Sequence, residues 1–273
     1  MAPPQPNVPT EVLAVTRTFL EAADAAAPGL VEALYLVGSV AQDDFRPDSS
    51  DIDFVAISED RPDSEDLAAL RLAHIEVRRR HSDVAFDGTH LCWRDLALNP
   101  DQCAPASYCY EGNFESSGRF AMNPVTWHEL AHLGVPVRGP ELQLGQVWCD
   151  DAVLRRWTID NLRSYWIPWM DRYQTRRSDS RFDDGLVMWC VLGVPRLHYT
   201  IATGHITSKT GAGRYAMTTF DAKWKPIIIE ALRVRNQPTT STVYSDLSDR
   251  YRDANDFVRV VIADGLRLGE RQD

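Results

Sequence analysis

Residues 33–58 have the sequence ALYLVGSVAQDDFRPDSSDIDFVAIS, a pattern that restricts the folds open to this chain. An apolar run of strand length stops at Gly38 and Ser39, and a second apolar run contains Asp51 and Asp53 at alternate positions. Because side chains in a strand alternate between two faces, these aspartates share one face and lie about 7 Å apart along the strand. Two such carboxylates form half of a cage for a hard divalent cation such as Mg2+, which prefers oxygen ligands.

The pair Gly38-Ser39 is suited to hold an anion beside that cation. Glycine lets the backbone come close to a ligand, and N–H groups at the start of a following short helix attract negative charge. An Asp-x-Asp pair by itself is more often a solvated acidic face, but here it lies within an otherwise buried strand, where unpaired charges are costly. The stretch therefore predicts a site for a metal ion and a phosphate group.

Length and charge narrow the class of protein. A chain of 273 residues exceeds the usual size of one domain, so we expect two, over 1–149 and 150–273. The net charge of -10 argues against a nucleic-acid partner and favours a small cationic substrate. No apolar run is judged long enough to span a membrane, and prolines stand where a signal peptide would be basic and then apolar, so we expect a cytoplasmic monomer without a membrane partner. The five cysteines are scattered, without a Cys-x-x-Cys pair, which favours reduced thiols over a zinc cluster or a disulfide framework: Cys92, Cys103, Cys109, Cys149 and Cys190.

A third carboxylate, Asp87, lies in the middle of a strand predicted over 84–92. Phosphoryl transfer to a hydroxyl benefits from such a group, which acts as a metal ligand or as the base for the attacking oxygen. Asp83 and Asp95 are alternatives, although both fall at the expected ends of the strand. The next stretch, 99–118, is polar and irregular, and we expect a long loop there.

Two further segments carry candidate chemistry. Glu111 and Phe114 are predicted to line a substrate cleft, although aromatic residues of that loop packed on the core are the competing interpretation. His128, Glu129 and His132 match the zinc-protease pattern H-E-x-x-H, in which two histidines hold Zn2+ and the glutamate is the base. The short helix and the strand expected directly after it make a poor context for a protease, so a zinc hydrolase is kept as an alternative.

Apolar periodicity indicates helices over 10–26 and 64–81 in the first half of the chain. The second half is predicted to be helical, with helices in the following segments: 150–173, 186–203, 221–236 and 244–268. The segment 204–210 lacks the second glycine of a P-loop. It contains Lys209, one of three lysines in the chain, whose flexible ammonium is a good point charge for a polyphosphate.

These motifs together resemble the aminoglycoside adenylyltransferases that modify streptomycin and spectinomycin, the 3''/9 class of the nucleotidyltransferase (polymerase beta-like) superfamily. The N-terminal resemblance rests on Gly38-Ser39, Ser50-Asp51-Ile52-Asp53 and Asp87, and the C-terminal one on the run 191–231. The resemblance covers nearly the whole chain. It implies an α+β protein with an N-terminal mixed-sheet nucleotidyltransferase domain followed by a C-terminal α-helical bundle domain.

The same resemblance implies a function: Mg2+-dependent transfer of AMP from ATP to a hydroxyl of the drug. It implies the following roles: Asp51, Asp53 and Asp87 bind the metal, Asp87 is the catalytic base, and Gly38, Ser39, Ser50, Arg196 and Lys209 bind the nucleotide. The family usually has glutamate where this chain has Asp87. The acids that grip the drug are not clearly aligned around 183–189, and Asp183 is the candidate there.

Three other hypotheses remain at this point. The same transfer could act on another natural product or on a protein hydroxyl. An inactive small-molecule sensor is disfavoured because all three carboxylates are present. The zinc hydrolase would use a different reaction altogether.

Overall fold

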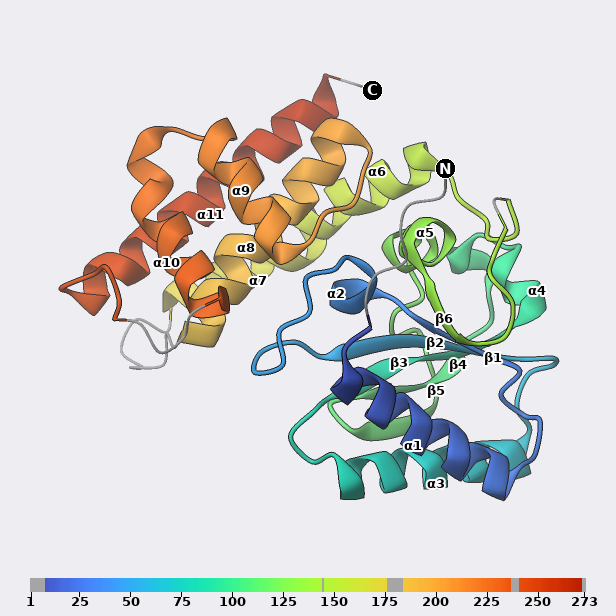
Figure 1. Cartoon of the computed structure of the whole chain (residues 1–273). Coiled ribbons are helices and arrows are strands. Elements are labelled where there is room, and N and C mark those ends of the chain that lie inside the picture. The colour runs from blue at the N-terminus through green and yellow to red at the C-terminus, as the bar shows by residue number, and fades with distance from the viewer. Residues whose placement is uncertain (1–7, 144, 176–183, 237–240, 272–273) are drawn as a thin grey trace. The chain divides into compact units, whose positions relative to one another are not determined.

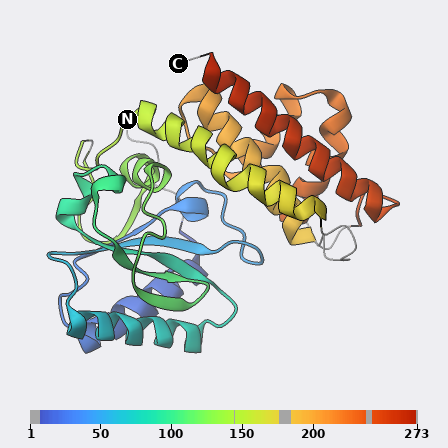
Figure 2. The same cartoon turned by 180° about the vertical axis from the view of Figure 1, so that it is seen from behind.

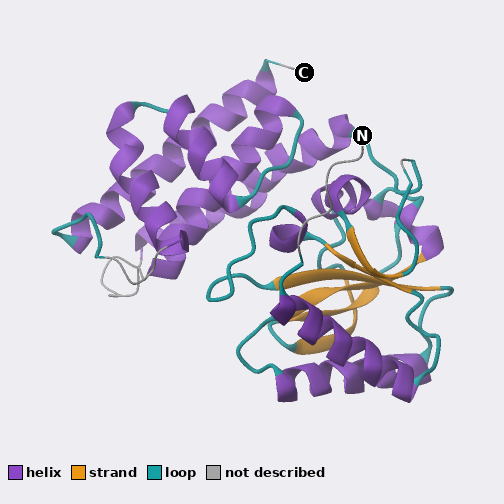
Figure 3. Cartoon of the chain, viewed as in Figure 1, coloured by secondary structure: helices purple, strands orange, loops and turns teal. Residues whose placement is uncertain are grey.

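The computed structural model describes residues 8–143, 145–175, 184–236 and 241–271 (Figure 1). Its internal contacts divide the chain into two compact units, residues 1–150 and 151–273. The first unit combines a β-sheet with helices, and the second is built from helices (Figure 3). The predicted α+β class, with a mixed sheet followed by a helical region, is confirmed.

The first unit is organised around a six-stranded sheet of order β5-β4-β3-β2-β1-β6. Strands β2 and β3 are parallel and every other neighbouring pair is antiparallel. The strands have the following bounds: β1 (Ala33–Leu36), β2 (Ile52–Ser58), β3 (Phe86–Cys92), β4 (Ala106–Tyr110), β5 (Asn113–Gly118) and β6 (Val135–Arg138). The stretch 33–58 therefore supplies two adjacent central strands, β1 and β2.

Helices cover both faces of this sheet. On one face α1 (Thr10–Ala26) and α3 (Ser64–Arg80) lie side by side, as both views show (Figure 1, Figure 2), and their apolar side chains pack on Phe54. On the other face α5 (Pro124–Leu133) packs through Trp127 on the strands. Two one-turn helices, α2 (Gly38–Ala41) and α4 (Trp93–Leu96), and a 3-10 turn (Pro100–Gln102) complete the unit.

Most of the predicted loop 99–118 is a β-hairpin, which corrects that expectation. Strands β4 and β5 pair with Tyr110 opposite Asn113, joined by Glu111 and Gly112. Both turn residues have positive φ, 49° and 70°. Positive φ at both central positions defines a type I′ turn, whose twist matches that of the flanking strands. The sequence did not predict the hairpin because the edge strand, β5, consists mostly of polar and small residues. The inner strand, β4, is positioned by its pairing with β3, which the local sequence does not encode.

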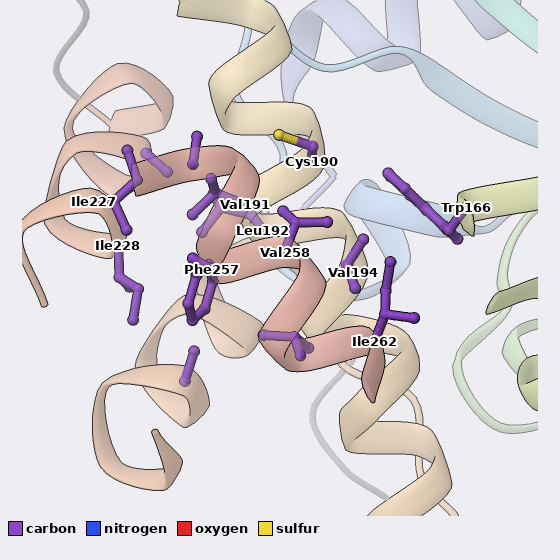
Figure 4. Packing of buried hydrophobic residues seen from close by; sticks show 14 of the residues in the cluster. Trp166, Cys190, Val191, Leu192, Val194, Ile227, Ile228, Phe257, Val258 and Ile262 are labelled. Atoms are coloured by element: carbon purple, nitrogen blue, oxygen red, sulfur yellow. The ribbon is translucent and has the colours of Figure 1, made fainter. Parts of the chain in front are cut away.

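The second unit packs its helices around α8 (Asp184–Thr203) and α11 (Leu247–Glu270), where Val191 and Val194 meet Phe257 and Val258 (Figure 4). The other helical elements are α6 (Asp151–Asn161), a π-helical turn (Leu162–Trp166), α7 (Ile167–Thr175), α9 (Lys209–Thr219), a 3-10 turn (Ala222–Trp224) and α10 (Lys225–Asn236).

One expectation about membranes needs correction. Among the described residues α8 is long and apolar enough, by length and composition, to count as a candidate membrane span. However, 61% of its apolar window is buried inside the structure. The core helix of a globular unit has this character, because a helix that is apolar all round must be covered on all sides.

Candidate active site

Three carboxylates meet where β2 and β3 begin. Asp53 and Asp87 are direct partners in the parallel register, so they point to the same face on strands about 4.8 Å apart. Asp51 directly precedes β2, two residues before Asp53, and its negative charge acts on Asp87. Asp51 is exposed, Asp53 is half-buried and Asp87 is only 4% exposed. The structure thus brings together the three acids that the sequence singled out.

Gly38 allows the turn after β1 to lie against this group. Its φ is +61°, and a Cβ added there would lie 2.1 Å from Oδ2 of Asp53. Both the conformation and the space therefore require glycine. The backbone N–H of Val37 donates to the carbonyl of Asp53 at 3.0 Å, which holds the turn on β2. The backbone at Gly38 thus lies close to a carboxylate of the site, and its approach to a phosphate group remains a prediction.

The environment of Asp87 is unusual for an acid. Burial raises its pKa from 3.8 to about 6, and the negative charges of Asp51 and Glu111 act in the same direction. The backbone N–H groups of Glu111 and Gly112 donate to the carboxylate and oppose the rise. Oδ1 of Asp87 is buried without a hydrogen-bond partner. This side chain is therefore held in place on one side and has an unsatisfied oxygen on the other.

These residues fit a hard divalent cation. The donors are all carboxylate oxygens, one of them is buried without a partner, and like charges stand close enough to raise the pKa of Asp87. A cation would satisfy that oxygen and relieve the repulsion. The competing acids are placed elsewhere: Asp95 pairs with Arg61 at 2.8 Å, and Asp83 is exposed before β3 begins.

A fourth acid, Glu129, was missed as part of this site. It is 5% exposed on α5, where Oε2 accepts the N–H of Gly38 at 3.3 Å and Oε1 accepts Nε2 of Gln42 at 2.7 Å. The carboxylate thus ties α5 to both ends of α2, the short helix that carries the Gly-Ser pair. The sequence did carry a signal for Glu129, because it is a charged residue between the apolar residues Trp127 and Leu130. A charge that is buried with such neighbours needs a polar partner.

This geometry is unfavourable to the zinc-hydrolase hypothesis. A metalloprotease base must face a metal-bound water. Both oxygens of Glu129 instead accept hydrogen bonds from Gly38 and Gln42. The histidines of the pattern do lie together on α5, with ring centroids 5.8 Å apart.

The serines of the predicted nucleotide site lie in the turns around the carboxylates. The Ser39 hydroxyl donates to the carbonyl of Asp51 over 3.5 Å, which is a long contact. The Ser50 hydroxyl accepts the N–H of Arg46 at 3.0 Å and so stabilises the turn before Asp51. The nucleotide contacts of both serines remain predictions.

The substrate residues predicted from the sequence have different outcomes. Phe114 is 8% exposed and packs among the side chains beneath α1 and α3, on the face of the sheet opposite Asp53. Its expected place in a cleft wall is therefore wrong, because the pairing of β5 with β4 turns its ring toward the core. Glu111 is exposed at the hairpin turn, beside Asp87. Asp183 lies outside the described residues.

In the second unit the two predicted nucleotide cations belong to neighbouring segments. Nε of Arg196, on α8, donates to the carbonyl of Thr207 at 3.1 Å. Two residues later Lys209 begins α9, whose N-cap is the hydroxyl of Ser208. Arg196 thus stabilises the loop that leads to Lys209 through this hydrogen bond. The role of both residues in binding nucleotide remains a prediction.

Comparison with known proteins places both halves of the chain. Residues 17–93 match the family model for the nucleotidyltransferase domain, and residues 157–263 match that for the aminoglycoside adenylyltransferase C-terminal domain. No curated protein is significantly similar in sequence. The crystal structure of spectinomycin adenyltransferase AAD(9) from Enterococcus faecialis with ATP and spectinomycin is similar with a TM-score of 0.63 at 14% identity, over 90% of this chain and 98% of that chain. That likeness establishes a shared fold. The chain therefore carries a nucleotidyltransferase domain followed by the C-terminal domain of aminoglycoside adenylyltransferases, which identifies it as a nucleotidyltransferase enzyme.

Proposed function

We propose that this adenylyltransferase uses Mg2+-bound ATP and transfers AMP to a hydroxyl of an aminoglycoside or aminocyclitol of the streptomycin and spectinomycin type. The observation that carries the proposal is the register of Asp53 with Asp87, which places a buried oxygen without a partner beside a second carboxylate. The C-terminal match to aminoglycoside adenylyltransferases supports the class of acceptor.

Asp51, Asp53 and Asp87 would hold the metal. When bound, Mg2+ would neutralise charge on the transferred phosphoryl group and on the leaving pyrophosphate. Asp87 would take the proton of the acceptor hydroxyl. In the site without metal its pKa of about 6 leaves it mostly ionised at neutral pH, and the ionised carboxylate is the form that can accept a proton. The N–H groups of the hairpin turn would hold this carboxylate in one orientation during the transfer.

The turn after β1 would orient the triphosphate. The N–H of Gly38 is already bonded to Glu129, so the anion contacts at this turn would come from Ser39. Gly38 would contribute through its shape, because it lets the turn lie against Asp53. Lys209 and Arg196 would add positive charge for the triphosphate.

The acceptor would be recognised by charge. Glu111 is exposed directly beside Asp87, where it could attract an ammonium group of the drug close to the reacting hydroxyl. The net charge of -10 supports a cationic acceptor in the same way. An ammonium group held by Glu111 would orient the drug so that its hydroxyl lies close to Asp87.

The test is direct. The purified protein is incubated with ATP, Mg2+ and a panel of aminoglycosides and aminocyclitols, and pyrophosphate release is measured together with a mass gain of one AMP on each drug. We expect modification of at least one drug, lost when Asp53 is replaced by asparagine. Pyrophosphate release only with other natural products or with a protein acceptor would overturn the proposed acceptor class.

A further inference from the structure

A group of soft metal ligands lies in the first unit, apart from the three carboxylates. His128 and His132 stand one turn apart on α5, and Cys149 lies in the segment between β6 and α6. One ligand atom from each of these three side chains lies within 4.8 Å of the others. The proposed AMP transfer uses none of them.

His128 is oriented as a metal ligand would be. Its Nδ1 lies 3.0 Å from the carbonyl oxygen of Pro124. A carbonyl can only accept, so Nδ1 carries the proton and the lone pair is on Nε2. Ligand histidines in proteins commonly have this arrangement, in which a backbone carbonyl fixes the tautomer and the direction of the ring.

Cys149 differs from the other cysteines in its exposure. It is half-buried, whereas the other four are buried, and burial raises the pKa of Cys103 to about 11 and those of Cys109 and Cys190 to about 12. Its sulfur lies 3.8 Å from the carbonyl of Trp127, on the same helix as the two histidines. His132 is exposed, so an ion from solvent can reach the group.

We propose that His128, His132 and Cys149 bind a borderline-soft divalent cation, with Zn2+ as the best match. Nitrogen and thiolate donors select such ions over Mg2+, which keeps this site chemically distinct from the carboxylates. A tetrahedral zinc site requires ligand atoms about 3.3–3.8 Å apart, so binding would draw these atoms together by no more than about 1.5 Å. Solvent completes the coordination.

The role that follows is structural. Cys149 is the second-last residue of the first unit, and a metal bond would tie this end segment to α5. Hydrolysis is not part of the proposal, because both oxygens of Glu129 are bonded to Gly38 and Gln42. The bound ion would stabilise the native chain by mass action, since the two histidines share a face only once α5 has formed and Cys149 comes from a separate segment, so the three ligands assemble only on folding.

The experiment uses Co2+ as the probe, added to the untagged full chain after chelator treatment and in excess Mg2+, which occupies the carboxylates. A thiolate ligand gives a sulfur-to-Co2+ charge-transfer band in the near ultraviolet, and tetrahedral coordination gives strong visible bands. We expect one equivalent of Co2+ to produce both, and Zn2+ to displace it. Cys149→Ser should remove the charge-transfer band. His132→Ala, at an exposed position, should weaken Zn2+ binding by about 100-fold or more.

Two controls separate this site from surface binding. His205→Ala removes an exposed histidine outside the group and should leave the spectrum unchanged. Zn2+ should raise the Tm of the wild-type chain and not that of Cys149→Ser. The proposal is overturned if no charge-transfer band forms, if the band persists in Cys149→Ser, or if Zn2+ raises the Tm of both chains equally.

Discussion

Asp87→Asn tests the electrostatics of the proposed active site through stability as well as activity. In the wild type, burial and two neighbouring negative charges raise the pKa of Asp87 from 3.8 to about 6. The native state therefore holds this proton more tightly than the unfolded state does. Stability from the protonated form is complete below about pH 4 and is lost as the pH rises through about 6.

The magnitude follows from the pKa values. A rise from 3.8 to about 6 corresponds to about 3 kcal/mol once the group is fully ionised, and we expect about 2–3 kcal/mol. Asparagine keeps an acceptor for the N–H groups of Glu111 and Gly112 and carries no charge. Its amide N–H groups at the position of the unpartnered oxygen cost about 1 kcal/mol at every pH. The pH-dependent part of the difference therefore reports the buried charge.

The assay is urea unfolding of both chains in chelator between pH 4 and pH 8. Relative to the wild type, the free energy of unfolding of Asp87→Asn should rise by about 2–3 kcal/mol across this range. Mg2+ at pH 8 should stabilise the wild type and leave the variant unchanged. Turnover of the variant should fall by about two to four orders of magnitude, with a smaller effect on ATP affinity.

Asp83→Asn, at an exposed acid before the same strand, is the matched control and should show no such pH dependence. The reasoning fails if Asp87→Asn differs from the wild type by the same amount at pH 4 and pH 8. Equal stabilisation of both chains by Mg2+ would refute the metal assignment. If Asp83→Asn or Asp95→Asn is the inactive variant instead, the third carboxylate is misassigned.

Three further variants test the proposed roles of residues other than the three carboxylates. Gly38→Ala places a Cβ 2.1 Å from Oδ2 of Asp53, so Mg2+ affinity measured by calorimetry should fall at least about tenfold; unchanged affinity would contradict the packing. Glu129→Gln leaves one acceptor where two donors are bonded, so it should cost about 1 kcal/mol in urea unfolding and lower kcat by about tenfold without changing the pH profile. A loss of all activity with normal stability would instead indicate a direct chemical role. Lys209→Ala should weaken ATP binding by about tenfold in calorimetry, whereas Lys223→Ala, whose ammonium lies over the ring of the adjacent tryptophan, should not; equal effects would make Lys209 an ordinary surface residue.

Local patterns in the sequence predicted the elements that carry the site. Alternation of apolar and acidic residues predicted β2, and apolar periodicity predicted α1 and α3 with their observed starts. A close approach of the backbone at Gly38 was also predicted, because glycine has no Cβ to keep another group away.

The groups that each site residue contacts follow from the pairing of distant segments. The register that sets Asp53 beside Asp87, the hairpin turn that donates to Asp87, and the bond from Glu129 to Gly38 across 91 residues are all non-local. Phe114 illustrates the limit, since an aromatic residue in a polar segment could line a cleft or fill the core, and only the pairing of β5 with β4 turned it inward. Local periodicity encodes which face of an element is buried, whereas the group that it meets there depends on contacts between distant segments that form only when the chain folds.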